Sequence, residues 1–258
     1  MCNDCVRPDH SRLGRRDFLA VSAFGVPAML MARGEAASAL TVNAVAKPVE
    51  VAPGLRIHTR DEWGRNLKPR RKMRTEKDVK FLLVHHSAGN TFYSREQVKQ
   101  QLQIVYGIHT GVNKRWPDVC YNFFVDRFGG VWEGRKGSID GPVVADATGG
   151  SQGFAQLICL LGNYEEEKPS KAMMDSLAKL LGWLGTKYEI DLHQGRRVKF
   201  VSRGSDKWPK GVRVSGRPIS GHRDMSYTTC PGANVYSLLE TSVPKAARAF
   251  QKTLTVAP

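Results

Sequence analysis

Uninterrupted apolar runs mark two segments of the chain as buried strands. The segments "VKFLLVHHSAG" (79–89) and "FAQLICLLGNY" (154–164) hold apolar residues without regular alternation, and each run leads into a glycine. This pattern is typical of strands that are buried on both faces of a sheet. The segment "CYNFFVDRFGGVWEGR" (120–135) instead joins two alternating runs at a Gly-Gly pair, which predicts a β-hairpin.

Three other segments carry apolar residues three or four positions apart, the spacing of amphipathic helices. We expect the first to begin at Ser94 as its N-cap, the second to follow Pro169-Ser170, and a single last helix to run on from Pro231. Their apolar positions are Val98, Leu102, Val105 and Ile108; Met174, Leu177, Leu181 and Leu184; and Tyr236, Leu239, Val243 and Phe250. Strands that alternate with helices, together with one hairpin, predict a single α/β domain with a central mixed sheet flanked by helices.

The first 39 residues have the composition of an export segment. Arg15 and Arg16 precede Phe18-Leu19, an apolar run follows, and the segment ends in Ala-Ser-Ala. A charged region, a short apolar region and an A-x-A cleavage sequence are typical of a secretory signal peptide, and the arginine pair indicates the twin-arginine route. We therefore expect residues 40–54 to be a linker or an early edge strand and residues 55–252 to be the folded domain.

The predicted export segment indicates where the protein should be found and whether it should stay in a membrane. The protein should be found in the periplasm, in the cell wall or outside the cell. After residue 40 no run approaches the roughly 18 consecutive apolar residues that a membrane-spanning helix needs. We therefore expect no stable membrane insertion once the signal is cleaved.

An excess of basic residues remains after the export segment is removed. The 258-residue chain has 39 Lys and Arg against 24 Asp and Glu, a formal charge of +15. Residues 1–39 hold five of the basic and four of the acidic residues, which leaves +14 on the rest. Such a charge predicts attraction to polyanions, and for an exported protein anionic wall polymers are favoured over nucleic acid as partners.

The stretch "ISGHRDMSYTTCPGANVY" (219–236) contains the strongest candidate chemistry. His222 and Cys230, eight residues apart, are ligand types that zinc prefers, and a catalytic zinc site usually has three protein ligands. His85 and His86 at the end of a buried strand could supply the third. Strand alternation sends these two side chains to opposite faces, so only one of them can be the ligand, and the residues alone favour neither.

Four ordered blocks give the sequence a resemblance to a known family. "FLLVHHSAG", "VCYNFFVDRFGGVWEGR", "ICLLGNYEEEKPS" and "ISGHRDMSYTTCPG" resemble the peptidoglycan recognition proteins and the related phage-type zinc amidases. The likeness spans nearly all of residues 55–250, and the basic segment 200–224 is similar to the secreted bacterial branch. The resemblance implies that family's mixed α/β fold and a zinc-dependent N-acetylmuramoyl-L-alanine amidase, which cuts the amide between N-acetylmuramic acid and L-alanine in peptidoglycan.

The resemblance also implies roles for individual residues. One Zn²⁺ would be held by His85, His222 and Cys230, with Tyr121 and Thr228 as catalytic hydrogen-bond donors. His86 and His109 would be structural or line the substrate groove. Asp146 stands in "VVADATGG" where related sequences carry a histidine that contacts substrate, which puts the fine substrate preference in doubt but leaves the metal set intact.

Two points stay open at the level of sequence. The group that takes the proton from water is unassigned, since Asp224 is as well suited to orienting His222 or capping the loop as to acting as a base. The three cysteines after the signal are an odd number for an oxidising compartment. If Cys230 binds metal, Cys120 and Cys159 remain to pair with each other or to stay buried as thiols, and we expect them to lie close together.

Three functional hypotheses follow from these observations. A monomeric zinc amidase that acts on the muramyl peptides of peptidoglycan is preferred. A module that only binds peptidoglycan is the alternative, and it is disfavoured because binding-only relatives tend to lack the cysteine found here as Cys230. A nucleic-acid binder or nuclease is the third hypothesis, and only the net charge supports it. The sequence shows neither a recognition helix nor the pattern of aromatic and basic residues that binds single strands.

Overall fold

The computed structural model describes residues 46–146 and 153–255. The predicted export segment, residues 40–45 of the predicted linker and most of the glycine-rich turn after Asp146 lie outside these ranges. No helix in the described ranges is long and apolar enough to cross a membrane.

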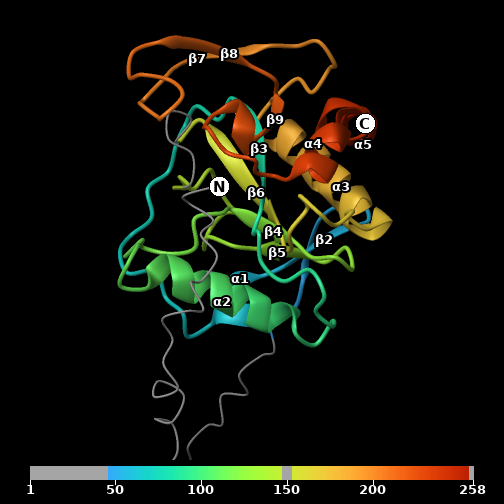
Figure 1. Ribbon diagram of the computed structural model, residues 1–258. Helices are drawn as coiled ribbons and strands as arrows, with labels where there is room; N and C mark the ends of the chain where they lie inside the picture. The colour runs from blue at the N-terminus through green and yellow to red at the C-terminus, as the bar shows by residue number, and fades with distance from the viewer. Residues whose placement is uncertain (1–45, 147–152, 256–258) are drawn as a thin grey trace, which may run out of the picture. The chain divides into compact units, whose positions relative to one another are not determined.

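A seven-stranded mixed sheet forms the centre of the domain, in the order β1-β2-β5-β4-β6-β3-β9 (Figure 1). Its central strands β3 and β6 pair in parallel, whereas the β4–β5 hairpin and the β1–β2 edge are antiparallel. The strands are β1 (Val49–Ala52), β2 (Leu55–His58), β3 (Phe81–His86), β4 (Phe123–Val125), β5 (Val131–Glu133), β6 (Ala155–Leu160) and β9 (Ile219–Gly221). The mixed sheet, the two buried strands and the hairpin are confirmed, and β1 shows that the expected linker includes an edge strand.

Helices cover both faces of this sheet. The helices are α1 (Arg60–Gly64), α2 (Val98–Thr110), α3 (Lys171–Lys187), α4 (Ala233–Glu240) and α5 (Val243–Thr255), with a short 3-10 helix η2 (His222–Asp224) after β9. One core cluster joins Leu82 and Val84 of β3 to α3, α4 and α5. A second cluster joins Phe81 and Leu83 to α1 and α2. Alternate residues of β3 therefore belong to different cores, as expected for a strand buried on both faces.

A separate two-stranded ribbon, β7 (Val198–Val201) with β8 (Arg213–Gly216), lies beyond the β9 edge at the top of Figure 1. Its apolar side packs into the second cluster, where the rings of Phe200 and Phe81 are 5.2 Å apart. The ribbon is built from the basic stretch that precedes the "GHRD" motif.

Two of the helix expectations were wrong. Ser94 is not the N-cap of α2, because the backbone N–H groups of Gln97 and Val98 donate to the carbonyls of Ser94 and Arg95 in a turn that precedes the helix. The helix begins at Val98, with Gln97 as its N-cap. The expected single last helix is two helices. Pro244 has no N–H to bond the carbonyl of Glu240, so α4 ends at Glu240 and α5 begins at Val243. The expected start of α3 after Pro169-Ser170 is confirmed, and Oγ of Ser170 caps the helix by accepting from the N–H of Met173 at 3.1 Å.

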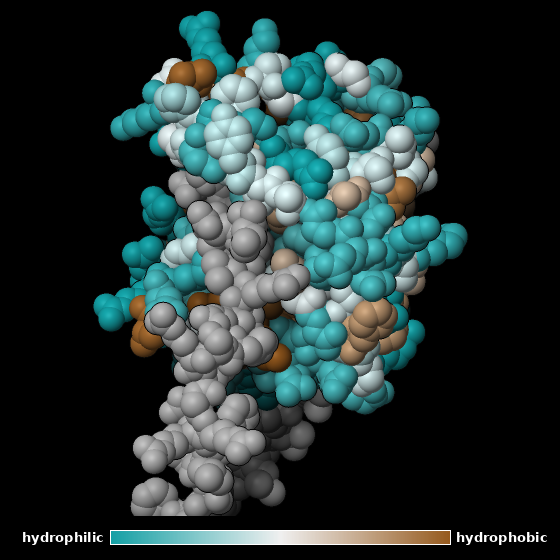
Figure 2. Space-filling model, viewed as in Figure 1, coloured by the Kyte–Doolittle hydropathy of each residue, from teal (hydrophilic) through white to brown (hydrophobic). Residues whose placement is uncertain are grey.

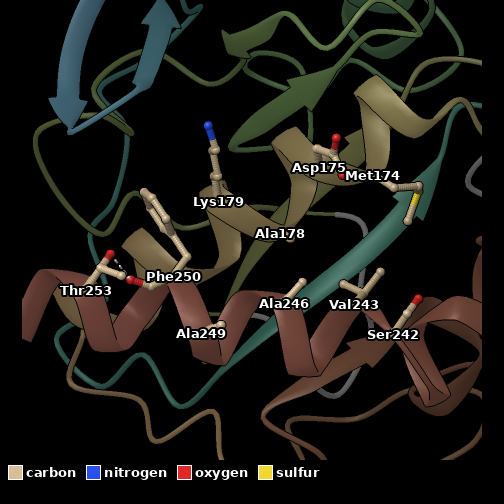
Figure 3. Close-up of a pocket in the computed structure, with 10 residues that line it drawn as sticks. All are labelled: Met174, Asp175, Ala178, Lys179, Ser242, Val243, Ala246, Ala249, Phe250 and Thr253. Carbon is tan, nitrogen blue, oxygen red and sulfur yellow. Dashed lines mark hydrogen bonds between the residues drawn. The ribbon is translucent and has the colours of Figure 1, made fainter.

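The groove between α3 and α5 lies on the sheet face covered by these helices (Figure 3). It encloses about 530 Å³ and is lined mainly by small and apolar side chains, including Met174, Ala178, Val243 and Phe250. None of the sequence-predicted site residues is among its lining residues.

Candidate metal centre

Three side chains of the types that bind metals, from distant parts of the chain, lie together next to the second core cluster. The ligand atoms of His85, His222 and Cys230 all lie within 4.8 Å of one another, and all three residues are buried. The Sγ of Cys230 is 3.7 Å from Nδ1 of His85. The rings of His85 and His222 have their centroids 4.4 Å apart. The structure thus brings together the ligand set that the sequence resemblance implies.

Strand pairing explains this convergence. β9 runs parallel to β3, with Val84 opposite Gly221, so both strands deliver the residues after this pair to the same end of the sheet. His85 follows Val84, and His222 follows Gly221. The carboxyl ends of parallel strands are where α/β sheets commonly place ligands, because the loops that leave them can converge there.

The structure distinguishes the two neighbouring histidines. His85 lies on the same side of β3 as Phe81 and Leu83, next to His222 and Cys230. The ring of His86 is directed elsewhere, and its Nδ1 accepts from the backbone N–H of Tyr164 at 3.2 Å. The backbone N–H of His86 donates to Sγ of Cys230 at 3.4 Å, and a donor of this kind favours a thiolate. This backbone contact is one that sequence patterns do not reveal.

Two glycines allow the loop that carries His222 and Cys230 to fold tightly. A Cβ at Gly221 would lie 2.9 Å from both Pro231 and the ring of Tyr236. Gly232, with φ of +90°, brings its Cα so close to the backbone of Tyr164 that a Cβ would lie 2.3 Å away. These contacts are the physical reason for glycine in "SGHRD" and "CPG".

Asp224 closes the same loop as a cap. Its Oδ2 accepts from the backbone N–H of Gly221 and from Nη2 of Arg217, each at 2.9 Å. Its Oδ1 accepts from the hydroxyl of Tyr236 at 2.7 Å. With three donors on one carboxylate, the structure favours the capping role among those left open for Asp224.

The ligand cluster fits a zinc ion by its chemistry and its spacing. Two imidazoles and one thiolate are a donor set that zinc prefers, and tetrahedral bonds to nitrogen and sulfur place these two atoms about 3.6 Å apart. The distance between Sγ of Cys230 and Nδ1 of His85, 3.7 Å, agrees with that spacing. The three residues could therefore hold one metal ion without a large rearrangement.

The two residues expected to supply catalytic hydroxyls lie near this cluster. The ring of Tyr121 is buried, with its centroid 5.1 Å from that of His85. Thr228 is half-buried, and its Oγ1 accepts from the backbone N–H of Cys230 at 3.2 Å. Accepting this bond leaves the hydroxyl proton of Thr228 available for donation to another group.

His109 lies behind Tyr121, and their ring centroids are 5.6 Å apart. Burial is the main reason why the pKa of His109 is lowered to about 3, and the charges of Lys114 and Arg135 act in the same direction. The backbone N–H of Cys120 donates to Nδ1 of His109 at 3.2 Å, which requires that nitrogen to be unprotonated. His109 is thus held as a neutral imidazole.

Asp146 is bound to a buried cation. Its Oδ2 lies 2.5 Å from Nη2 of Arg135, which is almost fully buried and also donates to the carbonyls of Val119 and Val144. Through Arg135, Asp146 is therefore tied to the backbone of Val119 and Val144. No sequence pattern indicates this partner, because eleven residues with no regular period separate the two.

The two remaining cysteines of the domain are buried thiols in the structure and are not joined by a disulfide. Both belong to the second core cluster. The Sγ of Cys120 is 3.6 Å from Nε2 of His109, and the Sγ of Cys159 is 3.8 Å from the carbonyl oxygen of Leu160. Of the two alternatives left open by the sequence, the structure has the buried thiols.

Comparisons with known proteins agree with this arrangement. The family model for "N-acetylmuramoyl-L-alanine amidase" matches residues 75–233. Peptidoglycan-recognition protein SC2 of Drosophila melanogaster is 27% identical over 203 residues, which cover 79% of this chain and 95% of that protein.

Solved structures share the fold. The crystal structure of Drosophila peptidoglycan recognition protein SD has a TM-score of 0.57 at 20% identity, covering 72% of this chain and 94% of that one. A mutant of Drosophila PGRP-LB in complex with tracheal cytotoxin has a TM-score of 0.55 at 20% identity, covering 72% and 94%. At this level of identity these likenesses concern the fold alone. The family match extends over more than half of the sequence, and the chain belongs to the N-acetylmuramoyl-L-alanine amidase family, to which peptidoglycan recognition proteins are related.

Proposed function

We propose that the protein is a zinc-dependent N-acetylmuramoyl-L-alanine amidase that hydrolyses the bond between N-acetylmuramic acid and L-alanine in peptidoglycan. The observation that carries the proposal is the meeting of His85, His222 and Cys230 within 4.8 Å. A protein that only binds peptidoglycan, without cleaving it, would not need a buried thiolate beside two imidazoles. Membership of the amidase family and the tracheal cytotoxin bound by a solved relative support the substrate class.

The metal-binding residues set the charge of the site. Two neutral imidazoles and one thiolate would leave one net positive charge on a bound Zn²⁺. The N–H of His86 supports the thiolate form of Cys230 at 3.4 Å. When bound, zinc polarises a substrate carbonyl and lowers the pKa of a coordinated water.

The hydroxyls of Tyr121 and Thr228 would serve the developing oxyanion. Hydrolysis of an amide places negative charge on the carbonyl oxygen, and pre-positioned donors stabilise that charge by about 3 kcal/mol each. The ring of Tyr121 is fixed by its burial against His85 and Phe124. Thr228 is fixed through the N–H of Cys230, so its position is tied to that of a ligand. His109 as a neutral ring, and Asp146 through Arg135, would shape the wall of the substrate groove.

The partners and location of the protein follow from the same proposal. The muramyl peptides of peptidoglycan are the substrate, and nucleic acid is not a partner. Export by the twin-arginine signal in residues 1–39 would bring the chain to the periplasm, the cell wall or the exterior, where it would act as a monomer. The pocket on α3 and α5 has no part in this chemistry, since its lining residues include no histidine or cysteine.

The test is digestion of purified peptidoglycan, with the release of alanine amino groups measured together with the metal content of the protein. Activity should disappear with a chelator and return with added zinc. Cys230→Ser should lower both metal content and activity. Cys159→Ala removes another buried thiol and should keep one metal ion per chain. Binding of muramyl peptides without any release of amines by the zinc-loaded protein would favour the binding-only alternative and overturn the proposal.

A further inference from the structure

The β7–β8 ribbon has two faces of opposite character. Val198 pairs with Gly216 and Val201 with Arg213, so residues at odd positions share one side. The even positions Phe200 and Val214 are buried in the second core cluster. The odd positions are exposed, and they are Lys199, Val201, Arg213 and Ser215. Arg197, which precedes β7, is also exposed, and its Nη2 donates to the carbonyl of Ser215.

The ribbon and its flanks carry an unbalanced charge. Residues 193–217 contain eight Lys and Arg but one acid, Asp206. Three of these cations are neutralised by described acids: Arg196 by Asp191, Arg203 by Glu76, and Arg217 by Asp224 and Glu240. Among the ion pairs of the described residues, none involves Arg197, Lys199 or Arg213. Figure 2 shows mainly hydrophilic residues over the top of the molecule, where this ribbon lies.

The spacing of these three cations suits a linear polyanion. Alternate residues on one face of a strand are about 7 Å apart, so Arg197 and Lys199 form a row with Arg213 on the neighbouring strand. Arginine binds phosphate oxygens through two parallel N–H donors, and lysine adds a mobile point charge.

The exposed face of the ribbon lacks what a single-stranded nucleic acid requires. Such ligands bind largely by stacking of their bases on aromatic side chains. The ring of Phe200 points into the core, and Trp208 in the ribbon's connecting loop is half-buried with its Nε1 donating to the carbonyl of Asp224 at 3.4 Å. A polyanion without bases fits this surface better.

The connecting loop of the ribbon is attached to the loop that carries His222 and Cys230. Nζ of Lys207 donates to the carbonyl of Arg223 at 2.8 Å. Oγ of Ser205 donates to the carbonyl of Met225 at 3.3 Å. The carboxylate of Asp206 accepts from the N–H of Tyr227 at 3.2 Å. These bonds fix the connecting loop of the ribbon to the loop that carries two of the candidate ligands.

We propose that the exposed face of the β7–β8 ribbon, formed by Arg197, Lys199 and Arg213, binds a linear phosphodiester polymer that carries no bases, such as the anionic glycopolymers of cell surfaces. The binding is electrostatic and is separate from the metal centre. It does not depend on whether the protein cleaves peptidoglycan.

The test measures binding of the full chain to poly(glycerol phosphate) over a series of salt concentrations. In the triple variant Arg197→Gln, Lys199→Gln, Arg213→Gln, the slope of log affinity against log salt should become shallower by about 2, since each lost phosphate contact contributes about 0.7. Affinity at low salt should fall about tenfold or more. The matched control replaces three exposed lysines elsewhere, Lys168, Lys245 and Lys252, with glutamine and should keep the original slope.

Two further probes identify the class of partner. An oligothymidylate of equal charge and vesicles of phosphatidylglycerol should bind more weakly than poly(glycerol phosphate). Tighter binding of either one would overturn the proposal in favour of nucleic acid or of a membrane surface. An equal loss of binding in the control variant would also overturn it, because only total charge would then matter. Hydrolysis of a small soluble muramyl peptide should be the same in the triple variant as in the original chain.

Discussion

The sulfur of Cys230 lies 3.7 Å from Nδ1 of His85, although 145 residues separate the two in sequence. The contact depends on the parallel pairing of β3 with β9 and on the tight loop between Gly221 and Gly232. The contact joins one end of the sheet to the loop that carries Cys230. The same loop also contacts the basic ribbon and the segment that follows β6. The candidate metal centre is thus a product of several elements of the fold.

His85→Ala and His86→Ala should have different effects, because the two rings lie on opposite sides of β3. His85→Ala should abolish binding of one zinc ion per chain. His86→Ala should keep the metal but lose about 1–3 kcal/mol of stability, since the buried N–H of Tyr164 loses its acceptor. Metal content and urea unfolding of each variant measure the two effects. Loss of metal only from the His86 variant would show that the wrong histidine has been assigned.

Tyr121→Phe should lower kcat on peptidoglycan by about 10² to 10³, the effect of removing one oxyanion donor, without loss of metal. The ring that packs on His85 and His109 is retained, so the fold should not change. Tyr93→Phe is the matched control, because it removes a buried hydroxyl that donates to the carbonyl of Leu161. Equal rates for the Tyr121 and Tyr93 variants would show that the Tyr121 hydroxyl has no part in the reaction.

Asp224→Asn separates a cap from a general base. If Asp224 is a cap, it acts by positioning the loop that carries His222 and Cys230. The variant should then bind zinc about 10- to 100-fold more weakly. It should regain most of its activity when zinc is saturating. Loss of a general base would instead lower the rate by about 10² or more even with zinc bound. The comparison requires a zinc titration followed by kcat at saturation. A rate that stays low there would assign Asp224 to proton transfer.

His109 should make the stability of the metal-free protein depend on pH. Its pKa is about 3 in the folded state, against about 6.5 in an unfolded chain. The unfolded state therefore binds the proton first, and the contribution of His109 is complete above about pH 6.5. As the pH falls from there toward 3, up to about 1.4 kcal/mol is lost per pH unit.

This pH dependence can be isolated with one substitution. Urea unfolding of the chelated protein between neutral and acidic pH should show a shallower slope in His109→Gln than in the original chain. Chelation removes the contribution of metal release from the ligands. Parallel slopes for the two proteins would mean that folding does not change the pKa of His109.

Local rules were sufficient wherever neighbouring residues decide the structure. The apolar runs that became β3 and β6, the Gly-Gly turn between β4 and β5, and the Ser170 cap of α3 were all predictable, since each depends on burial or on bonds within a few residues. At Ser94 the same rules predict a helix start that is too early, because residues 95–97 form a turn before α2 begins at Val98. They also predict one last helix, whereas Pro244 cannot bond the carbonyl of Glu240 and the segment forms two helices, α4 and α5.

By itself the sequence determined the ligand types, the mixed α/β fold and the resemblance to zinc amidases, because these follow from residue identity, periodicity and spacing. The residues alone favoured neither His85 nor His86, and the resemblance implied His85. Only the tertiary structure gives the physical reason why His85 faces Cys230, which is the side of β3 that each core covers. It also decided that Asp224 meets three donors and that Asp146 meets Arg135. Those contacts join residues with no regular spacing, and only the packing of strands and loops brings them together.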